Sequence, residues 1–256
     1  MGKLQNNNLS LLAKEVLPTL LANLDINDDA MSIKISSALK AWNYEANYDL
    51  EAPSYFYKFW ENIEQTTYDE MTGNKLSFRL PEPYNTTNLI INDPKFKLFD
   101  VLTTDTIETA KEVINIAFAK TAAYFAELTK PSISMSAKQN AKETATKKDA
   151  VIWQHYKGTS VSHLARLDAF SVKDIAIGGY NNIVNAASEG AGPSWRMIVD
   201  FTNGKPQCYG VYPGGQSGNV ATKSFTEFID KWSKGEYYKM HFFANKESAL
   251  RVISKK

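Results

Sequence analysis

Two neighbouring stretches near the C-terminus contain the residues that come first into question for chemistry. GPSWRMIVDF (192–201) is typical of a turn and a buried strand, and GVYPGGQSGN (210–219) of a strand that runs into a glycine-rich loop. A nucleophilic serine on a strand-to-helix turn requires G-x-S-x-G, but Gly218 follows Ser217 directly. A phosphate-binding loop requires lysine after its last glycine, and Gln216 follows Gly215. We therefore expect a tight turn whose glycines adopt positive φ and let another backbone segment pass close by.

The remaining residues of catalytic or metal-binding type form no recognisable pattern. Cys208 is the single cysteine and lies in KPQCYGVY, a predicted strand, so we expect a buried thiol rather than a nucleophile. No histidine has a ligand-type partner at the short spacings of zinc motifs; the three are His155, His163 and His241. We assign no catalytic, substrate-binding or metal-binding residue in this chain.

Composition excludes several classes of function. The chain has 256 residues, and its 29 Lys and Arg against 28 Asp and Glu give a net charge of +1. That balance supplies no electrostatic attraction for nucleic acid or an anionic membrane. The N-terminal sequence does not have the pattern of a signal peptide, and no apolar run approaches the ~20 residues of a membrane span. The expectation is that the chain is either cytosolic or lacks its natural beginning.

Hydrophobic periodicity predicts helices in the first half. Apolar spacing indicates helices over 9–24, 30–42, 54–71 and 106–128, and residues 76–94 are expected to be irregular. Ser10 and Ser54 are predicted N-caps, and Pro18 is expected to kink or split the first helix. Gly73 is predicted to end the third helix. Residues 129–150, rich in Ser, Thr, Lys and Ala, are predicted to be a surface loop.

Strands dominate the predicted second half. We expect strands over 195–201 and 207–211, with Asn203-Gly204 as a hairpin signal between them. Ser224 is a predicted cap of a helix that ends near Lys234 before Gly235, and YYKMHFF is a predicted final strand. Helices followed by strands define an α+β class.

Five motifs in order resemble the C-terminal end of penicillin-acylase-type N-terminal-nucleophile amidohydrolases. They are WQHYKGTSVSHL, GGYNNIVNAAS, GPSWRMIVDF, YGVYPGGQSGN and FIDKWSKGEYYKMHF. Upstream, LQNNNLSLLAKEVLPTLL and ISSALKAW are similar to the helical stretch inside that family's catalytic chain. One departure is Asn219-Val220-Ala221-Thr222-Lys223, where a Pro-Gly-Ser-like run is usual.

The resemblance implies a nucleophile that this sequence does not contain. In the family, an α-amino-terminal serine, exposed by self-cleavage of a precursor, attacks the amide while its own amine takes the hydroxyl proton. Backbone N–H groups and an asparagine side chain stabilise the oxyanion. These groups, and the acidic residues of the family's calcium site, are expected upstream. No cofactor is expected in this chain.

The predicted organisation follows from this resemblance. Residues 1–128 would be a helical part of the acylase beta chain, 129–150 a surface loop, and 151–256 a strand-rich part completing a four-layer αββα sandwich. Arg196 would be a buried strand arginine paired with a carboxylate; a substrate contact by Arg196 or Gln216 is the less favoured alternative.

The functional expectation is a C-terminal fragment of an amidase that hydrolyses acyl-amide bonds of β-lactam or N-acyl homoserine lactone type, inactive alone. Its partners would be the alpha chain and the N-terminal part of the beta chain, in the periplasm or outside the cell. The alternative is a freestanding, non-catalytic binding or assembly module derived from an acylase. A third interpretation, an independent enzyme acting through Ser217 or Cys208, has no general base at a recognisable spacing.

Overall fold

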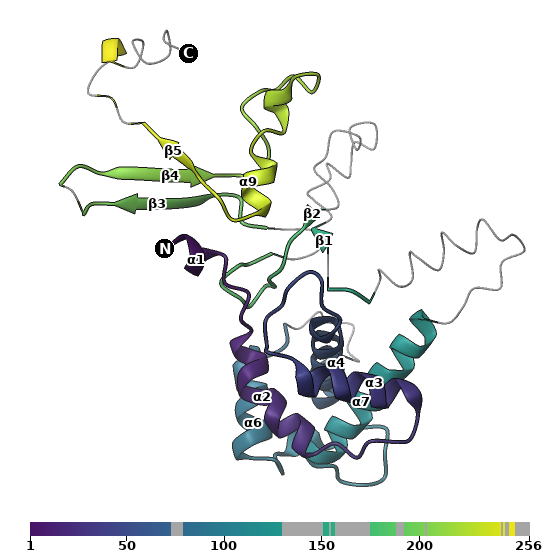
Figure 1. The fold of residues 1–256 in the computed structure, drawn as a ribbon. Helices are drawn as coiled ribbons and strands as arrows, with labels where there is room; N and C mark the ends of the chain where they lie inside the picture. The colour runs from purple at the N-terminus through teal and green to yellow at the C-terminus, as the bar shows by residue number, and fades with distance from the viewer. Residues whose placement is uncertain are drawn as a thin grey trace, which may run out of the picture. The chain divides into compact units, whose positions relative to one another are not determined.

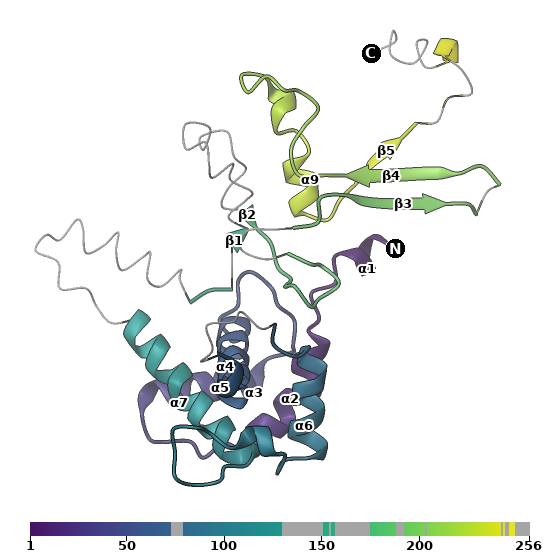
Figure 2. The ribbon, with the colours of Figure 1, turned by 180° about the vertical axis from the view of Figure 1, so that it is seen from behind.

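The structure, a computed structural model, divides into two compact units (Figures 1 and 2). It describes residues 1–72, 79–129, 151–153, 155–156, 175–187, 192–202, 204–241, 243 and 246–248. The helical unit comprises residues 8–155 and 178–183, and the sheet unit comprises 1–7, 156–177 and 184–256. Neither unit is a continuous stretch of chain, so each depends on segments distant in sequence.

The helical unit is built around the pairing of α4 (Ala52–Thr67) with α7 (Ala110–Leu128). Its other elements are α2 (Leu11–Ala22), α3 (Ala30–Ala41), α5 (Asp69–Thr72), α6 (Pro83–Asn92) and the 3₁₀ turn η1 (Lys97–Phe99). Rings at helical spacing on α4 meet rings on α7: Phe59 packs against Phe118 at 5.4 Å and Tyr55 against Phe125 at 4.7 Å between centroids. α3 packs against both helices, and α2 against α6.

The four helices predicted in the first half are confirmed, with corrections at their ends. α2 begins after Ser10, whose Oγ accepts a hydrogen bond from the Ala13 N–H at 3.2 Å. Pro18 does not split this helix, because the buried side chains on both sides of it, such as Val16 and Leu20, keep the two halves on one core. α4 begins at Ala52, two residues before Ser54. Pro53 lies in its first turn, where a backbone N–H has no partner within the helix, so proline loses no hydrogen bond there.

One helix was not predicted from the sequence, and another starts later than predicted. α6 occupies Pro83–Asn92, inside the stretch expected to be irregular; its proline again lies in the first turn, where it is compatible with a helix. α7 starts at Ala110 rather than at residue 106, and Ile107, which lies within the predicted range, is 86% exposed. The predicted stop at Gly73, and the surface loop beyond Thr129, lie outside the described residues.

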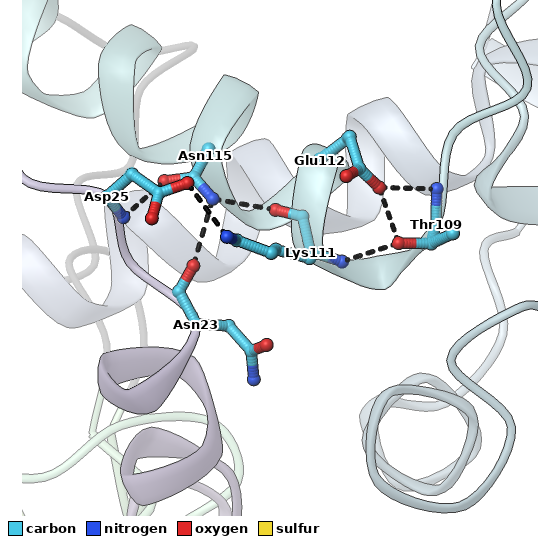
Figure 3. Close-up of polar contacts among 6 residues, drawn as sticks. All are labelled: Asn23, Asp25, Thr109, Lys111, Glu112 and Asn115. Carbon is cyan, nitrogen blue, oxygen red and sulfur yellow. Dashed lines mark hydrogen bonds and ion pairs between the residues drawn. The ribbon is translucent and has the colours of Figure 1, made fainter.

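Polar side chains fix the start of α7 and tie it to the residues that follow α2 (Figure 3). Thr109 caps the helix in a reciprocal capping box with Glu112, which satisfies otherwise unpaired N–H groups. Asn115 accepts from the Asp25 N–H at 2.8 Å and donates to the Asn23 carbonyl at 2.9 Å. Lys111 Nζ adds an ion pair to Asp25 at 3.1 Å. The asparagine side chain thus replaces backbone partners that the end of α2 leaves open.

The helical unit also includes the short segment 178–183. Trp153 Nε1 donates to the Gly179 carbonyl at 2.9 Å, and the Gly179 N–H donates to the Ala46 carbonyl at 2.8 Å. Tyr180 packs against Tyr57 with 4.0 Å between the ring centroids and with the ring planes tilted by 35°. The first of the two GGY glycines is confined as well, because a Cβ on Gly178 would lie 2.6 Å from the Ala46 carbonyl oxygen.

The sheet unit contains a three-stranded antiparallel sheet in the order β3-β4-β5, visible as neighbouring arrows in Figure 1. The strands are β3 (Arg196–Asp200), β4 (Gln207–Val211) and β5 (Tyr238–Met240). Asp200 pairs with Gln207, so the predicted hairpin is confirmed but its loop is longer than two residues. Gly204 in this loop has φ +69°. The predicted α+β class, helical first and antiparallel last, is confirmed.

Short elements complete the sheet unit. They are α1 (Gly2–Gln5), β1 (His155–Tyr156, at the boundary of the units), β2 (Ile175–Ala176), the 3₁₀ turn η3 (Lys223–Phe225) and α9 (Ile229–Ser233). The predicted helix over 224–234 is therefore interrupted, and Ser224 lies within η3 instead of capping a helix. The predicted stop at Gly235 is confirmed by its φ of +69°.

Glu64 on α4 generates a pH-dependent prediction. Burial raises the pKa of this carboxyl to about 7, and repulsion from Glu82 and Glu61 adds to the rise. The fold therefore favours the neutral form, and its stability falls as pH rises from the ordinary glutamate pKa toward 7. Glu64→Gln should match the natural protein at pH 4. Above pH 7 it should be more stable by an amount on the order of 1 kcal/mol, because partial exposure screens the charge.

Urea unfolding at a series of pH values measures this difference. Glu15→Gln, at an exposed position on α2, is the control and should show no such pH-dependent gain. A constant gap between Glu64→Gln and the natural protein from pH 4 to 9 would show that the carboxyl is not penalised by burial.

Candidate functional site

The motifs of the C-terminal half meet at the guanidinium of Arg196, the first residue of β3. Arg196 is 3% exposed. Its Nη1 donates to the Trp232 carbonyl oxygen at 2.7 Å and its Nη2 to Asn185 Oδ1 at 2.7 Å. The guanidinium also lies over the Trp232 ring, 5.2 Å from its centroid. One side chain therefore joins the strand, the end of α9 and the turn at residue 185.

The prediction that Arg196 pairs with a carboxylate is wrong. Its acceptors are a backbone carbonyl and an amide oxygen, and its Nε has no hydrogen-bond partner among the described residues. Burial lowers the pKa of the guanidinium, because a low-dielectric surrounding disfavours the charged form. Asn185 and Trp232 do lie in two of the quoted motifs, GGYNNIVNAAS and FIDKWSKGEYYKMHF, but neither residue is charged, so neither was considered as a partner.

Trp232 is the second fixed point of this cluster. It is fully buried, and its Nε1 donates to the Pro193 carbonyl at 2.8 Å. Its neighbours in the core of the sheet unit are Ile177, Ala187, Val211 and Phe228. The tryptophan thus uses its ring, its N–H and its carbonyl for internal contacts and holds the turn before β3 against α9.

The glycine-rich corner behaves as predicted. Gly214 has φ +133°, which side chains rarely tolerate. A Cβ on Gly215 would lie 2.0 Å from the Ser224 carbonyl oxygen, so this glycine lets the η3 backbone pass close by. The Ser217 N–H donates to that same Ser224 oxygen at 3.1 Å, and the Phe228 N–H donates to the Gly214 carbonyl at 2.9 Å.

The residues considered as nucleophiles or ligands are placed in structural or exposed positions. Cys208 is 3% exposed within β4, as predicted. Ser217 Oγ accepts from the Asn219 N–H at 3.0 Å in a local turn, and Gln216 is exposed. Of the histidines, His155 belongs to β1, His241 is exposed, and His163 lies outside the described residues.

Two further findings concern metal and membrane. Within the described ranges, no three His, Cys, Asp or Glu side chains are grouped so that they could hold a metal ion. In the same part of the chain, no helix has the length and apolar character that a membrane crossing requires.

Comparison with known proteins supports the family that these motifs resemble. The family model described as penicillin amidase matches residues 1–249. A stretch of 50 residues is 44% identical to the acyl-homoserine lactone acylase QuiP of Pseudomonas aeruginosa. That stretch is 20% of this chain and 6% of the relative, which is therefore more than three times as long. The chain belongs to the penicillin amidase family.

Arg196 generates the first prediction for this site. Arg196→Met should lower the free energy of unfolding by about 2–4 kcal/mol, because two charge-assisted hydrogen bonds are lost and buried acceptors are left unpaired. Arg196→Lys should be nearly as destabilising, since an ammonium cannot span both acceptors. Urea unfolding followed by tryptophan fluorescence measures the loss. The control is Arg79→Met, because the Arg79 side chain is 87% exposed; equal effects at the two positions would contradict the structural role.

The glycine corner offers a matched pair. Gly215→Ala places a methyl group against the backbone of Ser224 and Phe225, which cannot move away without opening the corner. We expect a loss of several kcal/mol, on the order of the largest single-residue effects. Gly218→Ala meets open space and should stay within about 0.5 kcal/mol of the natural protein. Thermal unfolding compares them, and a tolerated Gly215→Ala would refute the close approach.

Proposed function

We propose that this chain is part of an acyl-amide hydrolase, in which it forms scaffold around a catalytic serine supplied by another part of the enzyme. The family match over residues 1–249 supports the reaction class, and the relative's name is that of an acyl-homoserine lactone acylase. β-Lactam amides and N-acyl homoserine lactones are the substrate types proposed.

The observation that carries the scaffold role is how the motif side chains are used. The Arg196 side chain is hydrogen-bonded to Trp232 and Asn185, and the Ser217 hydroxyl accepts a hydrogen bond within its own turn. These contacts hold β3, the glycine corner and α9 in one arrangement. A residue acting as nucleophile or oxyanion donor instead has to present its polar atom to a substrate.

The rest of the enzyme is proposed to supply the chemistry. Its alpha chain and the N-terminal part of its beta chain would bring the α-amino-terminal serine, the oxyanion donors and the calcium site. The proposed location is the periplasm or the outside of the cell, as for family members.

Hydrolysis of a chromogenic phenylacetyl or long-chain acyl amide tests this proposal. The 256-residue chain is compared with a longer chain extended upstream through the predicted nucleophile serine. We expect activity only in the extended chain, and its loss when that serine is replaced by alanine. Activity of the shorter chain, removed by Ser217→Ala or Cys208→Ala, would refute the scaffold role. Inactivity of a folded extended chain on both amides would refute the hydrolase assignment.

A further inference from the structure

The loop that joins η1 to α7, residues 100–109, exposes two large aliphatic side chains to solvent. Ile107 is 86% exposed and Leu102 is 67% exposed. Single exposed apolar residues are normal on protein surfaces, so exposure alone assigns no role to either side chain. What sets this pair apart is a loop whose own contacts hold both residues in fixed positions at the surface.

A buried carboxylate closes this loop. Glu108 is 6% exposed, and its carboxylate accepts hydrogen bonds from the Val101 N–H at 2.9 Å and from the hydroxyls of Thr104 and Thr106, each at 2.7 Å. The bond to Val101 joins the two ends of the loop. The two exposed side chains belong to the residues just inside these ends, so the closed loop carries them at neighbouring positions.

Contacts with the rest of the helical unit fix the loop further. The Leu102 N–H donates to Asp69 Oδ2 on α5 at 2.9 Å, and the Val101 side chain is buried in the helical core. The loop ends at Thr109, which caps α7 (Figure 3). Ordering a surface loop costs conformational entropy, and these contacts order this loop within the chain itself. Preordered side chains suit a binding surface, because little ordering remains to be done on association.

The exposed charges of the loop all have one sign. Asp100 and Asp105 are exposed, and residues 100–109 contain no lysine, arginine or histidine. A second copy docked through the same loop would bring like carboxylates together, which opposes association. Nucleic acid and anionic membranes are disfavoured for the same reason. The loop is therefore complementary to an apolar pocket with lysine or arginine at its rim.

We propose that Leu102 and Ile107 insert into an apolar pocket, rimmed by lysine or arginine, on the acylase chain that lies outside this sequence. The inference rests on the proposed function. The relative that matches here is more than three times as long as this chain, so the proposed enzyme has ample chain to form such a pocket. Burial of the two aliphatic side chains removes apolar area from water, and the charges at the rim fix the orientation of the contact.

Photo-cross-linking tests the contact with nearly isosteric side chains. The extended chain is made with a diazirine analogue of leucine and illuminated, and its cross-linked peptides are mapped by mass spectrometry. Leu102 should form links to peptides outside the 256-residue sequence several-fold more often than Leu11, the matched control, which is 64% exposed on α2. In a folded extended chain, a yield from Leu102 no higher than that from Leu11, or links that stay within residues 1–256, would overturn the proposal.

Amidase activity measured on the same samples separates this inference from the proposed function. An active extended chain without links from Leu102 would refute the loop contact alone. Links from Leu102 in an inactive, folded extended chain would refute the function and leave the contact standing. A mixture of isotope-labelled and unlabelled chains reports contacts between copies: mixed-isotope links from Leu102 would replace the proposed partner by a second copy and overturn the proposal.

A pair of variants gives an independent readout. Ile107→Lys places a cation in the proposed pocket and against its basic rim, so it should lower the thermal midpoint of the extended chain by several degrees. Leu11→Lys, the same kind of change at the exposed start of α2, should leave the midpoint nearly unchanged. Asp105→Lys should also lower the midpoint, and added salt should reduce that loss because it screens charges near the surface. Equal midpoints of the Ile107→Lys and Leu11→Lys chains would contradict the proposal.

Discussion

The sheet unit depends on one buried cation, the guanidinium of Arg196. A charge taken out of water destabilises a fold unless oxygen atoms surround it, and here two such atoms come from Trp232 and Asn185. These partners lie 36 and 11 residues away in the sequence. A single side chain therefore fixes which turn and which helix contact the strand. The glycine corner connects β4 to that helix, so its position depends on the same contacts.

The chain returns to each unit after leaving it, and this constrains how the protein can be divided. Residues 1–7 belong to the sheet unit, where Gln5 Nε2 donates to the Met197 carbonyl at 3.0 Å and Asn6 Nδ2 to the Gly235 carbonyl at 3.3 Å. Residues 178–183 belong to the helical unit through Trp153 and Tyr180. A cut between the first and second halves of the chain would therefore remove residues from both units.

Local patterns predicted most elements, and the misses have physical causes. Apolar periodicity located α2, α3, α4 and α7, and the glycine spacing anticipated both the positive φ of Gly214 and the close approach at Gly215. α6 was missed because Pro83 lies in a proline-rich stretch that is typical of irregular structure, although proline is compatible with the first turn of a helix. The partners of Arg196 were missed because charge pairing was assumed, whereas a backbone carbonyl and an amide oxygen satisfy the guanidinium. Such acceptors depend on tertiary contacts that no local spacing encodes.

The central claim is that the motifs of this chain support an active site without supplying its nucleophile. The most direct test is covalent labelling of the active, extended enzyme with a serine-reactive sulfonyl fluoride, followed by mass-spectrometric mapping of the modified residue. The account predicts one label, on the N-terminal serine of the catalytic chain, and none within the segment that runs from Met1 to Lys256. Stoichiometric label on Ser217 or Cys208, with matching loss of activity, would contradict it.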